Sequence, residues 1–292
     1  MQDFRMETFI AVCRHRSFTK AAGELCITQP AVSQHIRFLE RAYEVRLFNR
    51  QGKQLSLTPA GQLLLDAALT MKHDDLQLKE RMRSVQQRRS YIFGATLTVA
   101  EYLLPATLPR FIAAHPRDRI ELKVANTSDL LDRLDAGEID FAVVEGNVPA
   151  GEYESLLYST EQYVAAAEPG LARRLMGMPV EALTNQVLIT REEGSGSREI
   201  LESALAQRGM SLSDFAQVIE LGSIGLIKRM VEDGLGVTFL YRVAVAQEER
   251  TGIIAVPQLK DFQVAHNIVF IYRKGTLFDD EYRQVFQELT AR

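Results

Sequence analysis

The sequence has no tryptophan, only two cysteines and no long apolar run among its 292 residues. A membrane-spanning helix needs about 20 consecutive apolar residues. The start of the chain also lacks a basic, apolar leader, so we expect a cytoplasmic protein that does not enter a membrane. Cys13 and Cys26 lack CxxC spacing. We interpret them as small core residues in a reducing compartment, with redox sensing as the alternative.

Several kinds of catalytic site are also missing. The histidines are too scattered to predict a metal site, at positions His15, His35, His73, His115 and His266. We find no Ser-His-Asp ordering and no phosphate-binding loop, so we expect neither an enzyme nor a resident cofactor. What the chain does have is uneven charge. Residues 1–60 carry an excess of four positive charges, and the remainder carries an excess of eight negative charges. A basic head on an acidic body is typical of a nucleic-acid-binding module joined to another domain.

The basic head has the pattern of three short helices. Apolar residues at Met6, Phe9, Ile10 and Cys13 follow helical spacing. Ser17 can cap a second helix, and Thr28 can cap a third that has Pro30 in its first turn. The third helix has an apolar face and a polar face. This pattern predicts a helix-turn-helix whose second helix enters the major groove.

The polar face supplies the candidate DNA contacts. Gln29, Ser33 and Gln34 would meet base edges, and Arg37 would reach a phosphate or a guanine. After the third helix, two short stretches around a basic turn, Val45 to Phe48 and Leu55 to Leu57, predict a β-hairpin wing. Its Arg50 and Lys53 would meet the DNA backbone. The full set of candidate DNA-binding residues is Ser17, Thr19, Thr28, Gln29, Pro30, Ser33, Gln34, His35, Arg37, Arg50 and Lys53.

The stretch SFTKAAGELCITQPAVSQHIRFLERAYEVRLFNRQGKQLSLTPAG resembles the N-terminal domain of LysR-type transcriptional regulators. Its AA-x-x-L, QPA-x-S, I-x-x-LE, V-x-LF-x-R and LT-x-AG elements follow in the family's order. The resemblance implies a dimeric, usually tetrameric, regulator of promoter DNA that works with RNA polymerase and responds to a small molecule. His35 departs from the arginine that is frequent in the family.

A long helix is expected next, from Ala60 to about Arg89. Leu64, Ala68, Met71, Leu78, Met82 and Val85 follow a heptad pattern that Asp75 interrupts. We predict that this linker helix pairs with a second copy, and the resemblance favours this interpretation. The alternative is a helix that packs against its own chain.

The acidic body alternates strands and helices in two similar halves. This predicts a bilobed α/β domain, which resembles the periplasmic-binding-protein type of effector domain in the LysR family. The fold class is therefore an all-α winged helix-turn-helix head and a long linker helix, joined to a bilobed α/β domain. The predicted boundaries are 1–58 for the head, 59–90 for the linker, 91–162 with 268–292 for the first lobe, and 163–267 for the second lobe.

Hydroxyl-rich segments follow the strands of this body, where ligands of parallel sheets bind. Free N–H groups at helix N-termini favour an anion there. The string GSGSRE and the opening GATLTVAEYLLP resemble the LysR subgroup related to sulfur-assimilation and carbon-fixation regulators. The candidate effector-binding residues are Thr96, Leu97, Thr98, Asn126, Thr127, Ser195, Gly196, Ser197, Arg198 and Ser223. Leu97 stands where the subgroup often has a hydroxyl residue.

These observations predict a DNA-binding regulator that senses a small anionic metabolite. Some alternatives stay open. The hydroxyls can simply cap their helices, and Arg198 can pair with Glu192, Glu193 or Glu202. The cleft can also lack an effector altogether. A transport solute-binding protein and an enzyme are the rival classes, which export or turnover would reveal.

Overall fold

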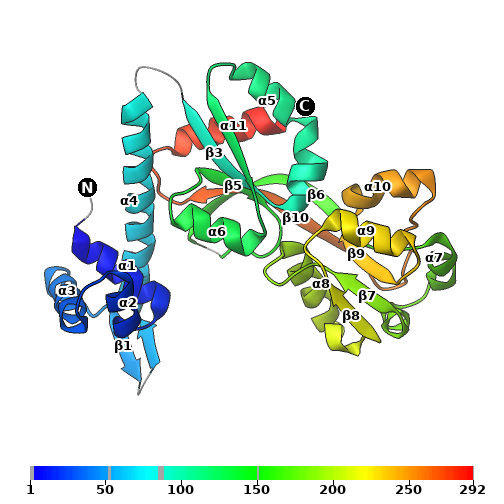
Figure 1. Cartoon of the computed structure of the whole chain (residues 1–292), viewed down its shortest axis with the longest axis horizontal. Coiled ribbons are helices and arrows are strands. Elements are labelled where there is room, and N and C mark those ends of the chain that lie inside the picture. The colour runs from blue at the N-terminus through cyan, green and yellow to red at the C-terminus, as the bar shows by residue number, and fades with distance from the viewer. Residues whose placement is uncertain (1–2, 52–53, 85–88, 150, 292) are drawn as a thin grey trace. The chain divides into compact units, whose positions relative to one another are not determined.

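The computed structural model describes residues 3–51, 54–84, 89–149 and 151–291. The chain forms two compact units. The first, here called the helical unit, runs to residue 87 and includes the short segments Asp135–Glu138 and Arg273–Asp279. The second, here called the α/β unit, comprises the rest of the chain. Figure 1 traces both units.

The head of the helical unit contains the three predicted helices. They are α1 (Phe4–His15), α2 (Phe18–Glu24) and α3 (Gln29–Ala42). Each begins at a side-chain cap, as local sequence signals indicate: the Ser17 hydroxyl accepts from the Lys20 N–H, and the Thr28 hydroxyl accepts from the Ala31 N–H. Small residues Ala21 and Ala22 are buried where the helices cross. This packing builds one core, to which α1, α2 and α3 all contribute.

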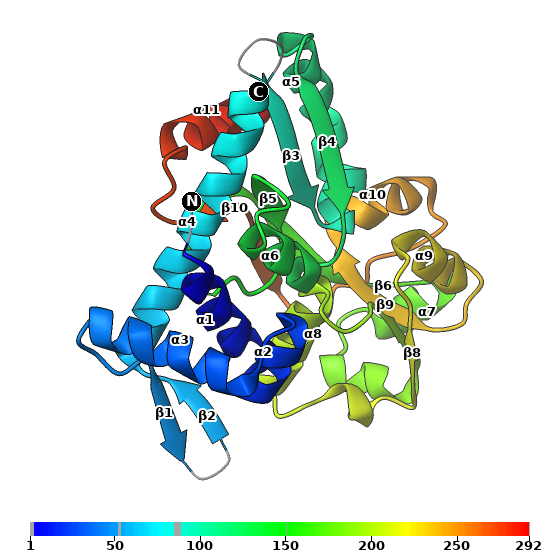
Figure 2. The same cartoon turned by 60° about the vertical axis from the view of Figure 1, so that its left-hand side comes forward.

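The wing is a two-stranded antiparallel hairpin of β1 (Phe48–Gln51) and β2 (Gln54–Leu57). The first strand was expected from Val45 to Phe48. Its predicted start is wrong, because β1 begins only at Phe48. Leu47 is instead fully buried in the head core. Figure 2 shows the hairpin projecting from the helices of the head.

The long helix α4 (Pro59–Ser84) follows the hairpin. Its predicted apolar seam divides into two parts. Ala68 is buried, and Leu64 packs with it against the core of the head. Met71, Leu78 and Met82 are exposed, with Met82 at 67%. The first part of the seam thus packs against its own chain, and Met71, Leu78 and Met82 face outward. Val85, the last residue of the predicted seam, lies outside the described residues.

The α/β unit contains one eight-stranded sheet in the order β4-β3-β5-β10-β6-β9-β7-β8. We call β3, β4 and β5 with their helices the first lobe, and β7, β8 and β9 with theirs the second lobe. The strands are β3 (Ser90–Ala95), β4 (Arg119–Val124), β5 (Phe141–Val144), β6 (Tyr153–Ala167), β7 (Val187–Thr190), β8 (Gln217–Glu220), β9 (Val237–Tyr241) and β10 (Val264–Arg273). β3 is parallel to β4 and β5, and β7 is parallel to β8 and β9. The two lobes therefore repeat the same parallel arrangement.

Helices cover the sheet of both lobes (Figure 1). They are α5 (Leu108–Ala114), α6 (Thr127–Asp135), α7 (Pro169–Leu175), α8 (Gly196–Ala206), α9 (Ile224–Glu232), α10 (Arg242–Thr251) and α11 (Asp279–Thr290), with short η3 (Val180–Asn185) and η4 (Leu212–Asp214). The long strands β6 and β10 run between the lobes without a break. The predicted lobe boundaries at 162/163 and 267/268 fall inside these two strands and stay predictions.

The segment that follows β3 does not form one continuous helix. The structure has a π-helical turn η1 (Val99–Leu103), a 3-10 turn η2 (Leu104–Ala106) and only then α5. Pro105 and Pro109 explain the breaks, because a proline lacks the N–H that a continuous helix needs at that position.

Candidate functional site

The exposed face of α3 is the first candidate site. Val32, Ile36 and Leu39 are buried at 0–4% exposure, whereas Gln29 is exposed and Ser33 is half-buried. The Gln29 amide donates to the Ser33 hydroxyl at 2.9 Å, and Arg37 Nε donates to the Ser33 carbonyl oxygen at 3.3 Å. These three residues form a connected polar row one helical turn apart. The row does not pack in the core of the head, so it is available for contact with base edges in the major groove.

The other predicted DNA contacts divide by position. Thr19, Pro30 and Gln34 are exposed, and Ser17 and Thr28 use their hydroxyls as helix caps. His35 is half-buried: its Nδ1 lies 2.9 Å from the Thr8 hydroxyl, and its ring packs edge-on against Phe4. Arg50 lies in β1, but its side chain and Lys53 lie outside the described residues.

The second candidate site lies where β3, β5 and α8 meet in the α/β unit. Five of its predicted hydroxyl residues are buried to 2% exposure or less: Thr96, Thr98, Thr127, Ser195 and Ser197. Sequence reasoning missed the residue on which they converge. Glu145, directly after β5, is 1% exposed and points its carboxylate into the hydroxyls.

The hydrogen bonds around Glu145 come from both lobes. One carboxylate oxygen, Oε2, accepts from Thr96 at 2.9 Å. The other, Oε1, accepts from Thr98 at 3.1 Å and from Ser197 of α8 at 2.8 Å. We call Thr96, Thr98 and Ser197 the hydroxyl ring. Its arrangement matches a group with negatively charged oxygens, since hydroxyl donors stabilise the ionised form of an acid.

The backbone on either side of Glu145 closes the contact between the lobes. Thr127 donates to the Glu145 carbonyl oxygen at 2.7 Å. Gly196 lies so close that an added Cβ would be 2.3 Å from this oxygen. The Tyr163 hydroxyl lies 2.8 Å from the Ser197 carbonyl oxygen, which fixes the start of α8 from the opposite side. Gly196 is therefore required for close approach, and not for an unusual backbone angle.

Burial determines the electrostatics of this site. It raises the pKa of the Glu145 carboxyl, while the three hydroxyls and the nearby Arg191 act in the opposite direction. Burial and the Glu145 charge also raise the pKa of Tyr163 and Tyr241. Arg191 is 4% exposed and pairs with Glu192 through Nε at 2.8 Å. Arg191 Nη1 and the Tyr241 hydroxyl are buried and have no hydrogen-bond partner among the described residues.

The remaining predicted effector residues lie outside the ring. Leu97 packs with the apolar core of the second lobe. The Asn126 side chain accepts from the Asp129 N–H, and exposed Ser223 accepts from the Leu226 N–H, so both act as caps. Arg198 pairs with Glu202 at 2.8 Å and with Glu220. Asn126 and Ser223 therefore cap their helices, and Arg198 pairs with Glu202, which are the alternatives to effector binding given above.

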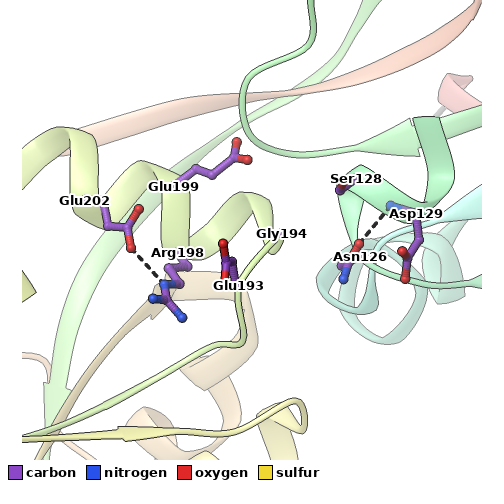
Figure 3. A pocket seen from close by; sticks show the side chains of 8 residues that line it. All are labelled: Asn126, Ser128, Asp129, Glu193, Gly194, Arg198, Glu199 and Glu202. Carbon is purple, nitrogen blue, oxygen red and sulfur yellow. Dashed lines mark hydrogen bonds and ion pairs between the residues drawn. The ribbon is translucent and has the colours of Figure 1, made fainter. Parts of the chain in front are cut away.

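A pocket of about 570 Å³ lies between the loop before α6 and the N-terminal part of α8, and none of the three ring residues lines it. Figure 3 shows Glu193, Glu199 and Glu202 on one side and Asp129 on the other, with Arg198 held by Glu202. Four carboxylates against one paired arginine make this pocket acidic. An anion would therefore be repelled by this pocket.

The two cysteines differ in burial. Burial raises the pKa of the Cys13 thiol to about 12, which keeps it protonated and unreactive at neutral pH. Cys26 is exposed, so its interpretation as a core residue is wrong. No metal-binding group of three His, Cys, Asp or Glu residues occurs in the described parts of the chain. No helix within those same parts is long and apolar enough to cross a bilayer.

A signal for Glu145 was present in the sequence. Glu145 directly follows the string IDFAVV and precedes a glycine, Gly146, whose φ is +91°. A carboxylate at the carboxyl end of a buried parallel strand faces the same sheet edge as Thr96. The signal for Arg191, directly after β7, is of the same kind.

Known proteins match both parts of the chain. The family model described as "LysR substrate binding domain" matches residues 85–292, and the one described as "Bacterial regulatory helix-turn-helix protein, lysR family" matches residues 4–62. The transcriptional activator CmpR of Synechocystis is 31% identical over 275 residues, which cover 93% of this chain and 89% of CmpR. A probable RuBisCO transcriptional regulator of Cyanophora paradoxa is 32% identical, over 84% of this chain and 77% of that protein.

The structure of the CcmR regulatory domain of Synechocystis, in complex with 2-PG, is similar with a TM-score of 0.62 at 20% identity. The match covers 70% of this chain and 99% of that domain. These findings confirm the predicted fold class and the resemblance to regulators of carbon fixation. The matched proteins are regulators and not enzymes. The chain belongs to the LysR family and is a LysR-type, DNA-binding transcriptional regulator with an effector-binding domain.

Proposed function

We propose that this regulator binds a small oxyanion in the hydroxyl ring and binds promoter DNA with the outer face of α3. The convergence of three hydroxyls on the Glu145 carboxylate carries the effector part, since it marks a place matched to charged oxygens. The similar structure of the CcmR regulatory domain in complex with 2-PG supports an anionic ligand in such a domain.

The DNA part of the proposal uses the row Gln29, Ser33 and Arg37. Their hydrogen bonds fix the side chains before binding, which reduces the entropy lost in a complex. The exposed Met71, Leu78 and Met82 of α4 would pair with a second copy of the chain. A tetramer, contact with RNA polymerase and a cytoplasmic location complete the proposal. They rest on the family resemblance.

The proposed mechanism is a shift between two arrangements of the lobes. The ring takes Thr96 and Thr98 from the first lobe and Ser197 from the second, so its occupant affects how the lobes meet. An effector that binds one arrangement better would change promoter binding, typically by about 1–3 kcal/mol of coupling.

The test is calorimetric titration of the full chain with inorganic phosphate and with sulfate, followed by DNA binding with and without the anion that binds. We expect Ser197→Ala to weaken anion binding by about tenfold, the value of one lost charge-assisted hydrogen bond. Arg229→Ala, which removes an exposed charge of α9, should leave it unchanged. Equal anion binding by the wild type and Ser197→Ala would contradict the proposal.

An effector-free regulator is the second candidate, and one observation favours it. The ring already has an acidic occupant from the same chain, the Glu145 side chain. In that case no anion should bind to the wild type at any concentration, and promoter binding should not respond to either salt beyond its ionic strength.

A further inference from the structure

The side chain of Glu145 has the chemistry of the ligand that the ring is proposed to bind. Both of its carboxylate oxygens accept hydrogen bonds, and the donors come from both lobes. A residue that only ended β5 would point to solvent. Glu145 is instead 1% exposed, in a place where a charged group is unfavourable unless hydrogen bonds compensate.

We propose that Glu145 is a tethered competitor of the effector, which fills the hydroxyl ring until an oxyanion displaces it. This inference rests on the proposed function, since it assigns the regulation of the same site. Because the competitor is part of the chain, its effective concentration is high, so only an anion with better contacts displaces it.

The surroundings of Glu145 contain what such an anion would use. Arg191 Nη1 and the Tyr241 hydroxyl are buried donors without a partner in the described structure. Both residues interact electrostatically with the Glu145 carboxylate. A carboxylate has two oxygens, and both are already bound to the ring. An oxyanion with three or four oxygens can keep the ring bonds and also accept from these two donors.

Displacement also removes an unfavourable burial. Burial raises the pKa of Glu145, which means that its ionised form is stabilised less here than in water. Arg191 would remain beside the site after Glu145 has left it. The ring therefore favours a phosphate-like or sulfate-like group over a simple monocarboxylate, which can offer no more contacts than Glu145 itself.

In the full-length protein, the substitution Glu145→Ala removes the carboxylate from the ring, and a free carboxylate is then added as a ligand. Acetate is the probe, because it carries the same group as the Glu145 side chain. We expect Glu145→Ala to bind acetate at least about tenfold more tightly than the wild type in calorimetry, since the tethered competitor is gone. The double variant Glu145→Ala, Ser197→Ala should lose this gain.

A neutral variant tests the same point with little change in shape. Glu145→Gln should bind inorganic phosphate or sulfate at least about tenfold more tightly than the wild type, because its amide accepts through only one oxygen. Glu193→Gln removes one exposed carboxylate of the acidic pocket and leaves the ring intact. This control should change the affinity by less than about twofold, since exposed charges are screened.

The outcomes separate this inference from the proposed function. If the wild type binds phosphate or sulfate, Ser197→Ala weakens it and Glu145→Gln does not strengthen it, the tethered competitor is overturned and the effector site stands. If Glu145→Ala binds acetate while the wild type binds no oxyanion, Glu145 is a competitor that nothing displaces, and the proposed effector is overturned. Should Glu145→Ala fail to fold, Glu145→Gln and Glu145→Asp carry the comparison, and affinities equal to the wild type would overturn the inference.

Discussion

Glu145 Oε1 accepts a 2.8 Å hydrogen bond from the Ser197 hydroxyl, and this pair joins the end of β5 in one lobe to the start of α8 in the other. Both residues are buried. A buried carboxylate that loses one of three donors is left partly unsatisfied. We therefore expect Ser197→Ala to lower the free energy of unfolding of the α/β unit by about 1–3 kcal/mol. Urea denaturation measures this change.

Ser203 provides the matched control for this prediction. It lies on the same helix, α8, but its side chain is exposed. Ser203→Ala should change the free energy of unfolding by less than about 0.5 kcal/mol. A loss of equal size in both variants would show that the effect belongs to the helix and not to the Glu145 contact.

The raised pKa of Glu145 predicts how stability depends on pH. The ordinary value is 4.5, and in the folded state burial moves it upward. The folded state therefore keeps its proton at pH values where the unfolded state has lost it. The protonated Glu145 therefore contributes to the stability of the folded state. This contribution is complete below pH 4.5 and is lost as the pH rises through the folded pKa of Glu145. The wild type should lose stability relative to Glu145→Gln over this window.

Urea denaturation of both proteins at a series of pH values tests this expectation. Tyr163 and Tyr241 also face Glu145 electrostatically, and the pKa values of both tyrosines are themselves raised; the Arg191 guanidinium lies near as a positive charge. Neither tyrosine loses its proton between pH 4.5 and neutrality, because both pKa values are raised above 10. A difference between wild type and Glu145→Gln that does not vary with pH in this range would refute the assignment.

Local signals made the head predictable from the sequence. Thr28 caps α3, Pro30 lies in its first turn, and Val32, Ile36 and Leu39 form its buried face. Each of these features depends on residues within about one or two helical turns. The start of the wing was harder to predict. Leu47 has the sequence pattern of a strand residue, but its side chain packs in the core of the head.

The effector site was only partly predictable, because its key contact is long-range. Thr96, Thr98 and Ser197 could be named, since each follows a parallel strand. Glu145 also follows a parallel strand, but its role as their common partner could not be predicted, because Ser197 lies 52 positions from Glu145 in the chain. A glutamate after an apolar strand has the same local pattern as a solvated strand end. Only the close approach of the two lobes distinguishes the buried Glu145 from a glutamate at a solvated strand end.

Gly196 should be intolerant of a side chain. An added Cβ would lie 2.3 Å from the Glu145 carbonyl oxygen and 2.8 Å from Thr127 Oγ1, and the backbone oxygen cannot move freely. We expect Gly196→Ala to lower the free energy of unfolding of the α/β unit by about 1–3 kcal/mol through overpacking. Thermal and urea denaturation check this value.

Gly225, near the start of α9, is the matched position. An added Cβ there would meet only Ser223 Oγ at 3.9 Å. Gly225→Ala should stabilise the unit by up to about 1 kcal/mol, because alanine favours a helix more than glycine does. If both variants behaved alike, close approach at Gly196 would not be the reason for its glycine.

The salt dependence of DNA binding by an Arg37 variant tests the proposed DNA surface. Its guanidinium lies on the exposed row of α3, held to the Ser33 carbonyl oxygen. If it contacts one phosphate, Arg37→Ala should reduce the slope of log affinity against log salt concentration by about 0.9. Arg14→Ala removes the same charge from α1, where Arg14 pairs with Glu24 at 3.0 Å. Binding titrations at several salt concentrations should show an unchanged slope for Arg14→Ala. An equal fall in both variants would mean that the head attracts DNA by net charge alone, without a defined contact from α3.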